Sequence, residues 1–299
     1  MGLFGTFDNF QLPGCGIPHS GSPPSIARHA IAKQSIEPGL SCFLKIAEFK
    51  RSLSHNLLWV VRFTALGNQV VDKAHRILRE AEELADLVQA AGKPLAGQLR
   101  MSVIPTIAPF LLPRFLPRLR RERPDLELLL REETSHDAVE SLQHGRVDCV
   151  LLALPFTTGE VEKAHIAHDE LYVAFPKDDP RDPPEFVPPS MIDEGRLLLL
   201  EDGHCLKDHA LAACNRPEMR ASATMIGTSL HTLVQMVDND LGLTMLPKMA
   251  VDAGILNGTD VVARPLKSKN ATREIALIWR KNSPRRADFE LLAEELRAG

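Results

Sequence analysis

The chain has 299 residues, of which 44% are apolar and 25% charged, and its formal net charge at pH 7 is −4. These values are close to those of globular proteins, and they exclude wholesale disorder and a uniformly basic nucleic-acid coat. No apolar run reaches the ~18 residues of a membrane helix, and no basic stretch leads into an apolar one near residue 1. We therefore expect a cytoplasmic protein without a membrane partner. Five cysteines are too few for a disulfide framework.

Residues 1–62 differ in composition from the rest of the chain. They hold six Lys and Arg against three acidic residues, whereas residues 63–299 carry a net charge of −7. A basic segment joined to an acidic body is typical of a DNA-contacting module attached to a sensor or an enzyme. Five prolines and six glycines within residues 1–40 favour loops, because proline removes a backbone donor and glycine raises chain entropy. Cys15 and Cys42 lie in this segment without chemical context.

A long helix is predicted over residues 63–92. Apolar residues recur at spacings of three and four from Val70 to Val88, and charged residues occupy the opposite face. A stripe this narrow indicates a helix that pairs with another helix, as in a dimer. The alternative is a surface helix packed on its own domain.

From residue 95 onward, predicted strands and helices alternate. Strands are predicted at 99–104, 126–131, 148–154, 171–175, 197–200, 243–246 and 274–279. Helices are predicted at 107–123, from Ser135 or Asp137 to His144, and at 207–214, 229–238 and 287–298. The strand at 148–154 is continuously apolar, as in strands buried on both faces of a parallel sheet. The alternation predicts an α/β fold with mainly parallel strands in two sheets.

Motifs of several common enzyme classes are missing from the sequence. It contains no GxGxxG, GxxxxGK[ST], HExxH or GxSxG pattern, which removes the usual support for dinucleotide, nucleoside-triphosphate, zinc-protease and α/β-hydrolase chemistry. His165 and His168, together with Asp169, have metal-ligand spacing, but two histidines on an edge segment are more often surface residues. We therefore predict no metal site and no cofactor.

Two cysteines, Cys205 and Cys214, carry the most informative chemistry. A strand ends at residues 201–203 and a helix begins near Cys205, where unpaired backbone N–H groups favour a thiolate. His204 and Lys207 add positive charge, so we expect Cys205 to be partly exposed, with a lowered pKa, and open to peroxide. On an intact helix the nine-residue spacing places the two residues ~13 Å apart, beyond the ~7 Å that a disulfide tolerates. A disulfide would require the helix to unwind.

The alternative reading of this segment is two unrelated thiols, one at the start of a helix and one on its apolar face. Cys149 lies between Asp148 and Val150 in an apolar strand and is predicted to be a core residue.

The segment Glu201–Cys214, EDGHCLKDHALAAC, resembles the redox segment of the peroxide-sensing, OxyR-like branch of the LysR-type transcriptional regulators. The resemblance continues through residues 63–84, 103–113, 145–154, 228–233 and 242–247, so it covers roughly 63–299. It implies a regulatory domain at 93–299 built from two Rossmann-like subdomains of the periplasmic-binding-protein type II fold. Subdomain I would comprise 95–168 and 270–299, and subdomain II 169–269, with a linker helix at 63–92.

The resemblance also implies roles for individual residues. Cys205 would be the peroxide-reacting thiol and Cys214 its resolving partner. Six residues would line the peroxide or effector site: Thr106, Thr134, His204, Lys207, Thr228 and Arg273. Lys207 stands where relatives often have arginine, so it keeps the charge but loses the planar fork.

Residues 1–62 depart from the family, which begins with a winged helix-turn-helix. Only residues 36–41 and 46–58 resemble parts of one, in a recognition helix and its exit toward the wing. We predict a degenerate winged helix-turn-helix region; the alternative is a different N-terminal module.

Three functions follow. The first is a peroxide-responsive transcription regulator, not an enzyme, with hydrogen peroxide as effector. Its partners would be promoter DNA, RNA polymerase and further copies of the chain in a homodimer or homotetramer. The second is a small-molecule-binding regulatory module with impaired or absent DNA binding, in which Thr106, Thr134, Thr228 and Ser229 hold a small anion. The third, a thiol peroxidase, is disfavoured because turnover needs a reductant site that the sequence does not display.

Overall fold

The computed structural model describes residues 93–214 and 226–298, together with separate positions between 64 and 84. The predicted head at 1–62, with Cys15 and Cys42, and much of the predicted linker helix lie outside the described residues. The described positions from Leu66 to Leu84 are helical, in agreement with the predicted helix. Leu66, Ile77 and Leu84, which belong to its apolar residues, are 69%, 67% and 66% exposed.

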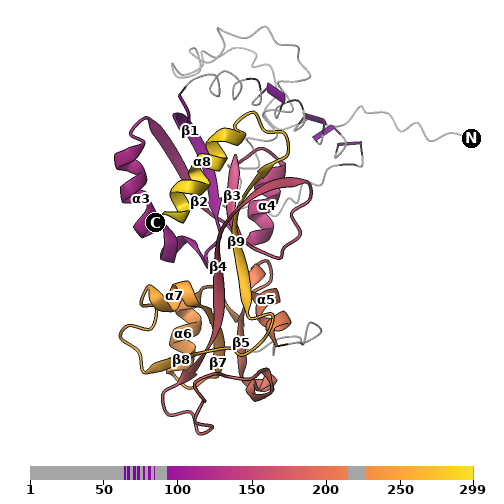
Figure 1. The fold of residues 1–299 in the computed structure, drawn as a ribbon. Helices are drawn as coiled ribbons and strands as arrows, with labels where there is room; N and C mark the ends of the chain where they lie inside the picture. The colour runs from indigo at the N-terminus through magenta and orange to yellow at the C-terminus, as the bar shows by residue number, and fades with distance from the viewer. Residues whose placement is uncertain are drawn as a thin grey trace, which may run out of the picture. The chain divides into compact units, whose positions relative to one another are not determined.

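One half of the fold is built on three parallel strands. Strand β1 (Gly97–Val103) pairs with β2 (Leu126–Glu132) on one side and with β3 (Cys149–Leu154) on the other. Helices α3 (Ala108–Glu122), α4 (Ser135–Gln143) and α8 (Arg286–Arg297) belong to the same half (Figure 1). Their apolar faces and the strands enclose a hydrophobic core that includes Met101, Phe115 and Trp279. We call this the β1–β3 half.

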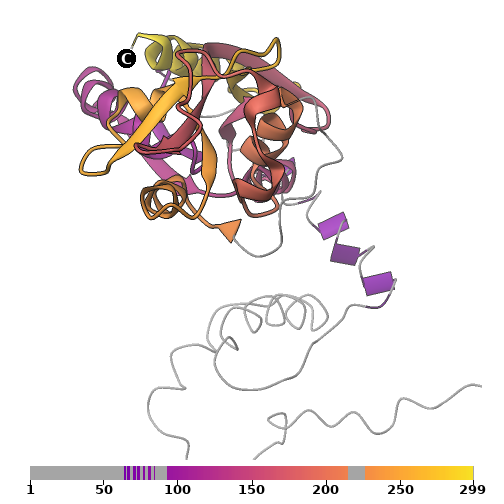
Figure 2. The same cartoon turned by 90° about the horizontal axis from the view of Figure 1, so that it is seen from below.

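The other half is also built on three parallel strands, and these strands are shorter. Strand β5 (Leu197–Leu200) pairs in parallel with β6 (Ile226–Gly227) and β7 (Leu243–Pro247). Helices α5 (Cys205–Ala213), α6 (Leu230–Asp238) and α7 (Lys248–Asp252) cover the strands, and two short 3-10 turns, Pro189–Met191 and Glu194–Arg196, precede β5. A second core includes Phe175, Leu233 and Met245. We call this the β5–β7 half; Figure 2 shows its helices and strands from below.

Two long strands connect the halves. Strand β4 (Val161–Pro176) pairs with β9 (Thr272–Arg280) over residues 161–170 and then with β7 and β8 (Val261–Pro265) over residues 171–176. Strand β9 also pairs with β3, so the sheet runs in the order β2-β1-β3-β9-β4-β7-β5-β6. In Figure 1 both strands extend from the upper half into the lower one.

The α/β class and the periplasmic-binding-protein-like architecture are confirmed, but the prediction of mainly parallel strands is wrong. The described ladders comprise four parallel pairs and four antiparallel pairs. The antiparallel pairs arise because β4 leaves the first half and β9 returns to it, so each of them runs against its neighbours. The two predicted sheets are joined through these strands.

Most predicted elements are confirmed to within a few residues, but the strand predicted at 171–175 is only the end of β4, which begins at Val161. Helix α4 is capped by Thr134, whose hydroxyl accepts a hydrogen bond from the Asp137 amide at 3.3 Å, and not by Ser135 or Asp137. The short elements β6, β8 and α7 have no sequence counterpart among the predictions, because runs of two to five residues show too little periodicity. Within the described residues, no helix is long and apolar enough to cross a membrane.

Candidate functional site

The turn between β5 and α5 places Cys205 at the first position of a helix. His204 caps the helix with an extended backbone, and Gly203 precedes it with a φ of +99°, a conformation that favours glycine. The amide of Cys205 donates to the Ser135 hydroxyl at 3.2 Å, and the amide of His136 donates to the Gly203 carbonyl at 3.3 Å. The start of α5, in the β5–β7 half, is therefore docked on the first turn of α4 in the β1–β3 half.

The Cys205 thiol is buried, and its pKa is raised. The residue is 1% exposed and packs in the core of the β1–β3 half. Burial raises the pKa of the thiol, while the Arg273 guanidinium, the Ser135 hydroxyl and the backbone of Ala153 lower it to a smaller extent. The prediction of a partly exposed thiol with a lowered pKa is therefore wrong for this conformation. Desolvation of the thiolate outweighs the helix N-terminus.

Cys214 lies at the opposite end of α5. It caps the helix, its amide donates to the Ala210 carbonyl at 3.2 Å, and its side chain is buried in the core of the β5–β7 half. Cys205, Cys214 and Cys149 are all thiols in this structure. Cys149 is buried in β3, where burial raises its pKa, as expected for a core residue.

Arg273, on β9, hydrogen-bonds to a residue of β4 and to the turn that precedes α3. Its side chain is fully buried, and Nε donates to Asp169 Oδ2 at 3.0 Å. Its Nη1 donates to the Thr106 hydroxyl at 2.9 Å and its Nη2 to the Thr106 carbonyl at 3.0 Å. Asp169 Oδ1 accepts a hydrogen bond from the Met249 amide at 2.9 Å. Two of the predicted site residues, Thr106 and Arg273, are thus in direct contact, and the buried carboxylate of Asp169 balances the Arg273 charge.

The other predicted site residues have different surroundings. His204 is 5% exposed, and burial lowers the pKa of its imidazole, although Glu201 at 3.9 Å raises it to a smaller extent. The expected positive charge at His204 is therefore wrong at neutral pH. Lys207 forms a hydrogen-bonded ion pair with the exposed Asp202, which balances its charge away from Cys205.

Thr134 and Thr228 complete the set. The Thr134 hydroxyl donates to Asp137 Oδ2 at 3.0 Å, and Thr134 lies against Gly203, so it adjoins the turn that carries Cys205. Thr228 follows β6 and is exposed. The structure therefore brings Thr134 and His204 to the turn that carries Cys205, and it brings Thr106 and Arg273 into direct contact. Among the residues that the structure describes, no hydrogen bond joins Thr228 to these groups.

The sequence did not predict two contacts near Cys205, those of Asp169 with Arg273 and of His209 with Pro155. Asp169 lies opposite Arg273 in the register of β4 and β9, a pairing that no local pattern reveals. His209 is one turn after Cys205 on α5; it is 5% exposed, and its Nε2 lies 2.9 Å from the Pro155 carbonyl oxygen. A histidine in the middle of an apolar helix face is the only sequence signal for this contact.

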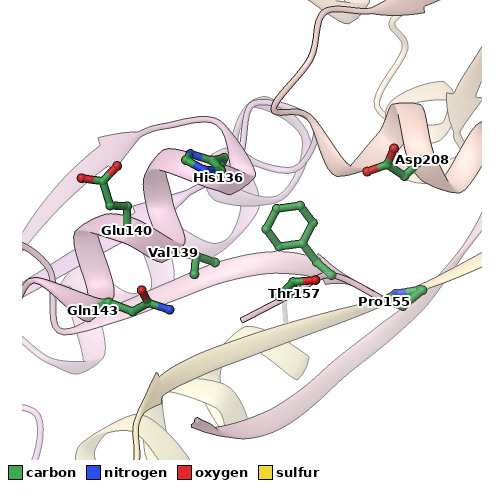
Figure 3. A pocket seen from close by; sticks show the side chains of 8 residues that line it. His136, Val139, Glu140, Gln143, Pro155, Thr157 and Asp208 are labelled. Carbon is green, nitrogen blue, oxygen red and sulfur yellow. The ribbon is translucent and has the colours of Figure 1, made fainter. Parts of the chain in front are cut away.

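A cavity of about 690 Å³ opens beside this contact (Figure 3). Helix α4, the β3–β4 loop and α5 contribute its lining: His136, Val139, Glu140, Gln143, Pro155, Phe156, Thr157 and Asp208. Its size is within the range of small-molecule pockets, and it combines two carboxylates with an imidazole and a phenyl ring. Because three separate segments form it, the sequence pattern did not predict it.

His165 and His168, which have the spacing of metal ligands, both lie on β4. The rings of His165 and His168 lie 4.6 Å apart, and His165 Nδ1 is 3.5 Å from Glu274. Among the described residues, the cluster whose ligand atoms lie within 4.8 Å of one another is instead His136, Asp137 and Glu140, all exposed. Both of its carboxylates already have protein partners, Thr134 and Arg146.

The fold agrees with what comparison with known proteins finds. Residues 92–299 match the LysR substrate binding domain. The HTH-type transcriptional regulator EstR of Acinetobacter baylyi is 39% identical over 240 residues, which cover 79% of this chain and 78% of EstR. The DNA-binding transcriptional dual regulator OxyR of Escherichia coli is 35% identical over 238 residues, which cover 80% of this chain and 78% of OxyR.

Solved structures of OxyR regulatory domains are similar in fold to this chain. The reduced regulatory domain of OxyR2 from Vibrio vulnificus superimposes with a TM-score of 0.63 at 36% identity, covering 69% of this chain and 97% of that one. The reduced OxyR regulatory domain from Pseudomonas aeruginosa has a TM-score of 0.60 at 32% identity and covers 69% of this chain and 100% of that one.

An α/β regulatory domain with a cysteine-bearing helix between its two cores defines a ligand- or redox-responsive transcription regulator. The chain belongs to the LysR family of transcriptional regulators, and within it to the OxyR branch. The relatives EstR and OxyR are both transcriptional regulators.

Proposed function

We propose that this protein senses hydrogen peroxide through a reversible disulfide between Cys205 and Cys214 and thereby controls how it binds promoter DNA. The observation that carries the proposal is the placement of two thiols at the two ends of one helix, with the buried charge of Arg273 close to the first. A relative in Haemophilus influenzae, 34% identical, is named a hydrogen peroxide-inducible genes activator. Related OxyR structures are known in a reduced and an oxidised form.

The chemistry needs two steps. The Cys205 thiolate attacks one oxygen of hydrogen peroxide, the O–O bond breaks, and the released hydroxide takes a proton to leave as water; Cys205 becomes a sulfenic acid. The Cys214 thiolate then attacks the Cys205 sulfur, the S–O bond breaks, and a second water leaves as the disulfide forms. The two thiols lose two electrons and peroxide gains them. Thr106, Thr134 and His204 supply hydrogen bonds to peroxide, and Arg273 favours the thiolate.

The second step requires a conformational change. An intact α5 separates the two residues by ~13 Å, whereas a disulfide needs Cα atoms within ~7 Å. Helix α5 must therefore unwind, and Cys205 and Cys214 must leave their separate cores. Such a change at the junction of the two halves would alter the regulatory domain as a whole and, through it, the DNA-binding region.

The domain organisation is part of the proposal. Residues 1–62 form a degenerate winged helix-turn-helix region, 63–92 a dimerisation helix and 93–299 the regulatory domain, with subdomain I at 95–168 and 270–299 and subdomain II at 169–269. The exposure of Leu66, Ile77 and Leu84 on a helix supports pairing with a second copy, because isolated apolar stripes favour helix association. Promoter DNA, RNA polymerase and a homodimer or homotetramer are the proposed macromolecular partners.

Peptide mass mapping of the purified full chain tests this function. Equimolar peroxide should produce a Cys205–Cys214 crosslinked peptide, and the Cys214→Ser variant should accumulate a Cys205 sulfenic acid that dimedone traps. Cys149→Ser is the matched control and should crosslink like the wild type. A gel-shift assay at several salt concentrations, with and without peroxide, should show a redox-dependent change in DNA binding. Peroxide that leaves Cys205 and Cys214 uncrosslinked would overturn the proposal.

The cavity of about 690 Å³ beside α5 favours a second candidate, a regulator that responds to a small molecule without thiol chemistry. A Cys205→Ser/Cys214→Ser double variant separates the two. It should lose all response to peroxide under the first proposal and keep its response to the physiological inducer under the second.

A further inference from the structure

His209 occupies a special position relative to the two thiols. It lies on α5 between Cys205 and Cys214, the helix that must unwind if the proposed disulfide is to form. Hydrogen bonds at two positions of α5 tie the helix to the β1–β3 half. At Cys205 the amide donates to Ser135, and the thiol also hydrogen-bonds to Ser135 and to the Ala153 backbone. At His209, Nε2 lies 2.9 Å from the Pro155 carbonyl oxygen. Pro155 and Asp208 line the cavity beside this contact (Figure 3).

The contact fixes the protonation state of the imidazole. Because a carbonyl only accepts hydrogen bonds, Nε2 must carry the proton and donate it to Pro155. Nδ1 is buried and has no hydrogen-bond partner, so a second proton there would point into surroundings that cannot accept it. The side chain is 5% exposed. The reduced conformation therefore accommodates His209 only as the neutral imidazole.

We propose that His209 is a positioning residue of the thiol switch, holding α5 against the β3–β4 loop in the reduced form and releasing it more readily when the imidazole can take up a second proton. This inference rests on the proposed Cys205–Cys214 disulfide. Unwinding of α5 breaks the bond to Pro155 and exposes the imidazole to water, where it can be protonated. Protonation is thus coupled to the oxidised form.

The charged groups around His209 agree with this direction. Burial lowers the pKa of its imidazole, and the Arg273 guanidinium on β9 acts the same way. The Pro155 carbonyl and the Asp208 carboxylate on α5 raise the pKa, but to a smaller extent than burial lowers it. An imidazole released from α5 has a pKa near 6.5, so below about pH 6.5 the unwound form binds a proton that the helical form rejects. Acid therefore favours the disulfide.

The test is the redox equilibrium of the full chain in glutathione buffers from pH 5.5 to 8, with the crosslinked fraction measured by alkylation and mass spectrometry. His209→Gln retains an N–H donor for Pro155 but does not titrate in this range. His209→Leu lacks the donor. His168→Gln removes an exposed histidine of β4 and serves as the matched control. His204 is present in all of these proteins, so its own titration cancels in the comparison.

At pH 8, His209→Leu should shift the equilibrium toward the disulfide by about fivefold, because it removes one buried hydrogen bond from the reduced form. His209→Gln should stay within about twofold of wild type, because it retains a donor for Pro155. Below pH 6.5, wild type and His168→Gln should gain disulfide relative to His209→Gln by up to about tenfold per pH unit. Parallel pH profiles of wild type and His209→Gln, or an unshifted His209→Leu, would refute the inference while leaving the disulfide intact. A wild type that forms no Cys205–Cys214 disulfide would refute both proposals.

Discussion

Cys205 is the first residue of α5 and Cys214 caps its other end, yet their side chains are buried in two different hydrophobic cores. Cys205 packs with β3 in the β1–β3 half, whereas the other buried apolar residues of α5 pack in the β5–β7 half. A bond between the two sulfurs must therefore remove at least one thiol from its core. While α5 is intact, it keeps the two cysteines apart and so prevents the disulfide from forming.

The buried ion pair of Arg273 and Asp169 should be essential for stability. Arg273→Leu leaves the Asp169 carboxylate buried without its partner, and we expect the free energy of unfolding in urea to fall by about 3–5 kcal/mol. Lys163→Ala is the matched control on the neighbouring strand, because Lys163 forms an exposed ion pair with Glu274 at 3.1 Å. It should cost less than about 1 kcal/mol. Equal losses in the two variants would contradict the assignment.

The Thr134 cap of α4 can be tested with two substitutions. Thr134→Ala removes the hydroxyl that accepts from the Asp137 amide, so we expect a loss of about 1 kcal/mol in the free energy of unfolding. Thr134→Ser retains the hydroxyl and should recover most of that loss. If the serine variant is no more stable than the alanine variant, the hydroxyl is not the source of the effect.

Burial of Cys205 has a kinetic consequence. Because desolvation raises the pKa of this thiol above its ordinary value of 9.0, alkylation by iodoacetamide should rise with pH and have its midpoint above that value. The same cysteine in urea-unfolded protein should titrate with an ordinary thiol pKa. Site-resolved mass spectrometry over pH 6–11 measures both profiles. A native midpoint below 8 would show that Arg273 and the helix terminus outweigh burial.

His204 should make the reduced protein less stable in acid. Burial lowers the pKa of its imidazole, so the unfolded chain takes up a proton at about pH 6.5 that the folded chain does not. Its contribution to stability is complete above pH 6.5 and is lost as the pH falls, by up to about 1.4 kcal/mol per pH unit. His204→Gln should flatten this decline in urea unfolding between pH 7 and 5, whereas His168→Gln should not. The idea fails if His204→Gln keeps the wild-type slope.

Periodicity was enough to predict most of the fold. The continuous apolar run that became β3 and the three- and four-residue spacing of α6 depend on local patterns, and both elements form where those patterns lie. The antiparallel passage of β4 and β9 was not predicted, because the direction of a strand is set by residues that lie about a hundred positions away, as in the pairing of Asp169 with Arg273. Local sequence contains no such information.

The site was predicted only in part, because some of its features depend on local sequence and others on contacts between distant segments. The spacing of Cys205 and Cys214 is local, so the need for α5 to unwind follows from sequence alone. The raised pKa of Cys205 does not, since burial among residues of β3 raises it and Arg273 from the distant β9 only partly offsets that effect. The His209 contact with Pro155 likewise joins two segments that are 54 residues apart. Lys207 is close to Cys205 in sequence, but its charge is balanced by an ion pair with Asp202.

Hydrogen exchange of the α5 amides tests the central claim most directly. In the reduced wild type the amides of residues 209–213 should be protected by the helix. One equivalent of peroxide should remove that protection at the same rate at which the Cys205–Cys214 peptide appears, and the Cys214→Ser variant should keep it. A disulfide that forms while these amides stay protected, or a loss of protection without the disulfide, would contradict the account.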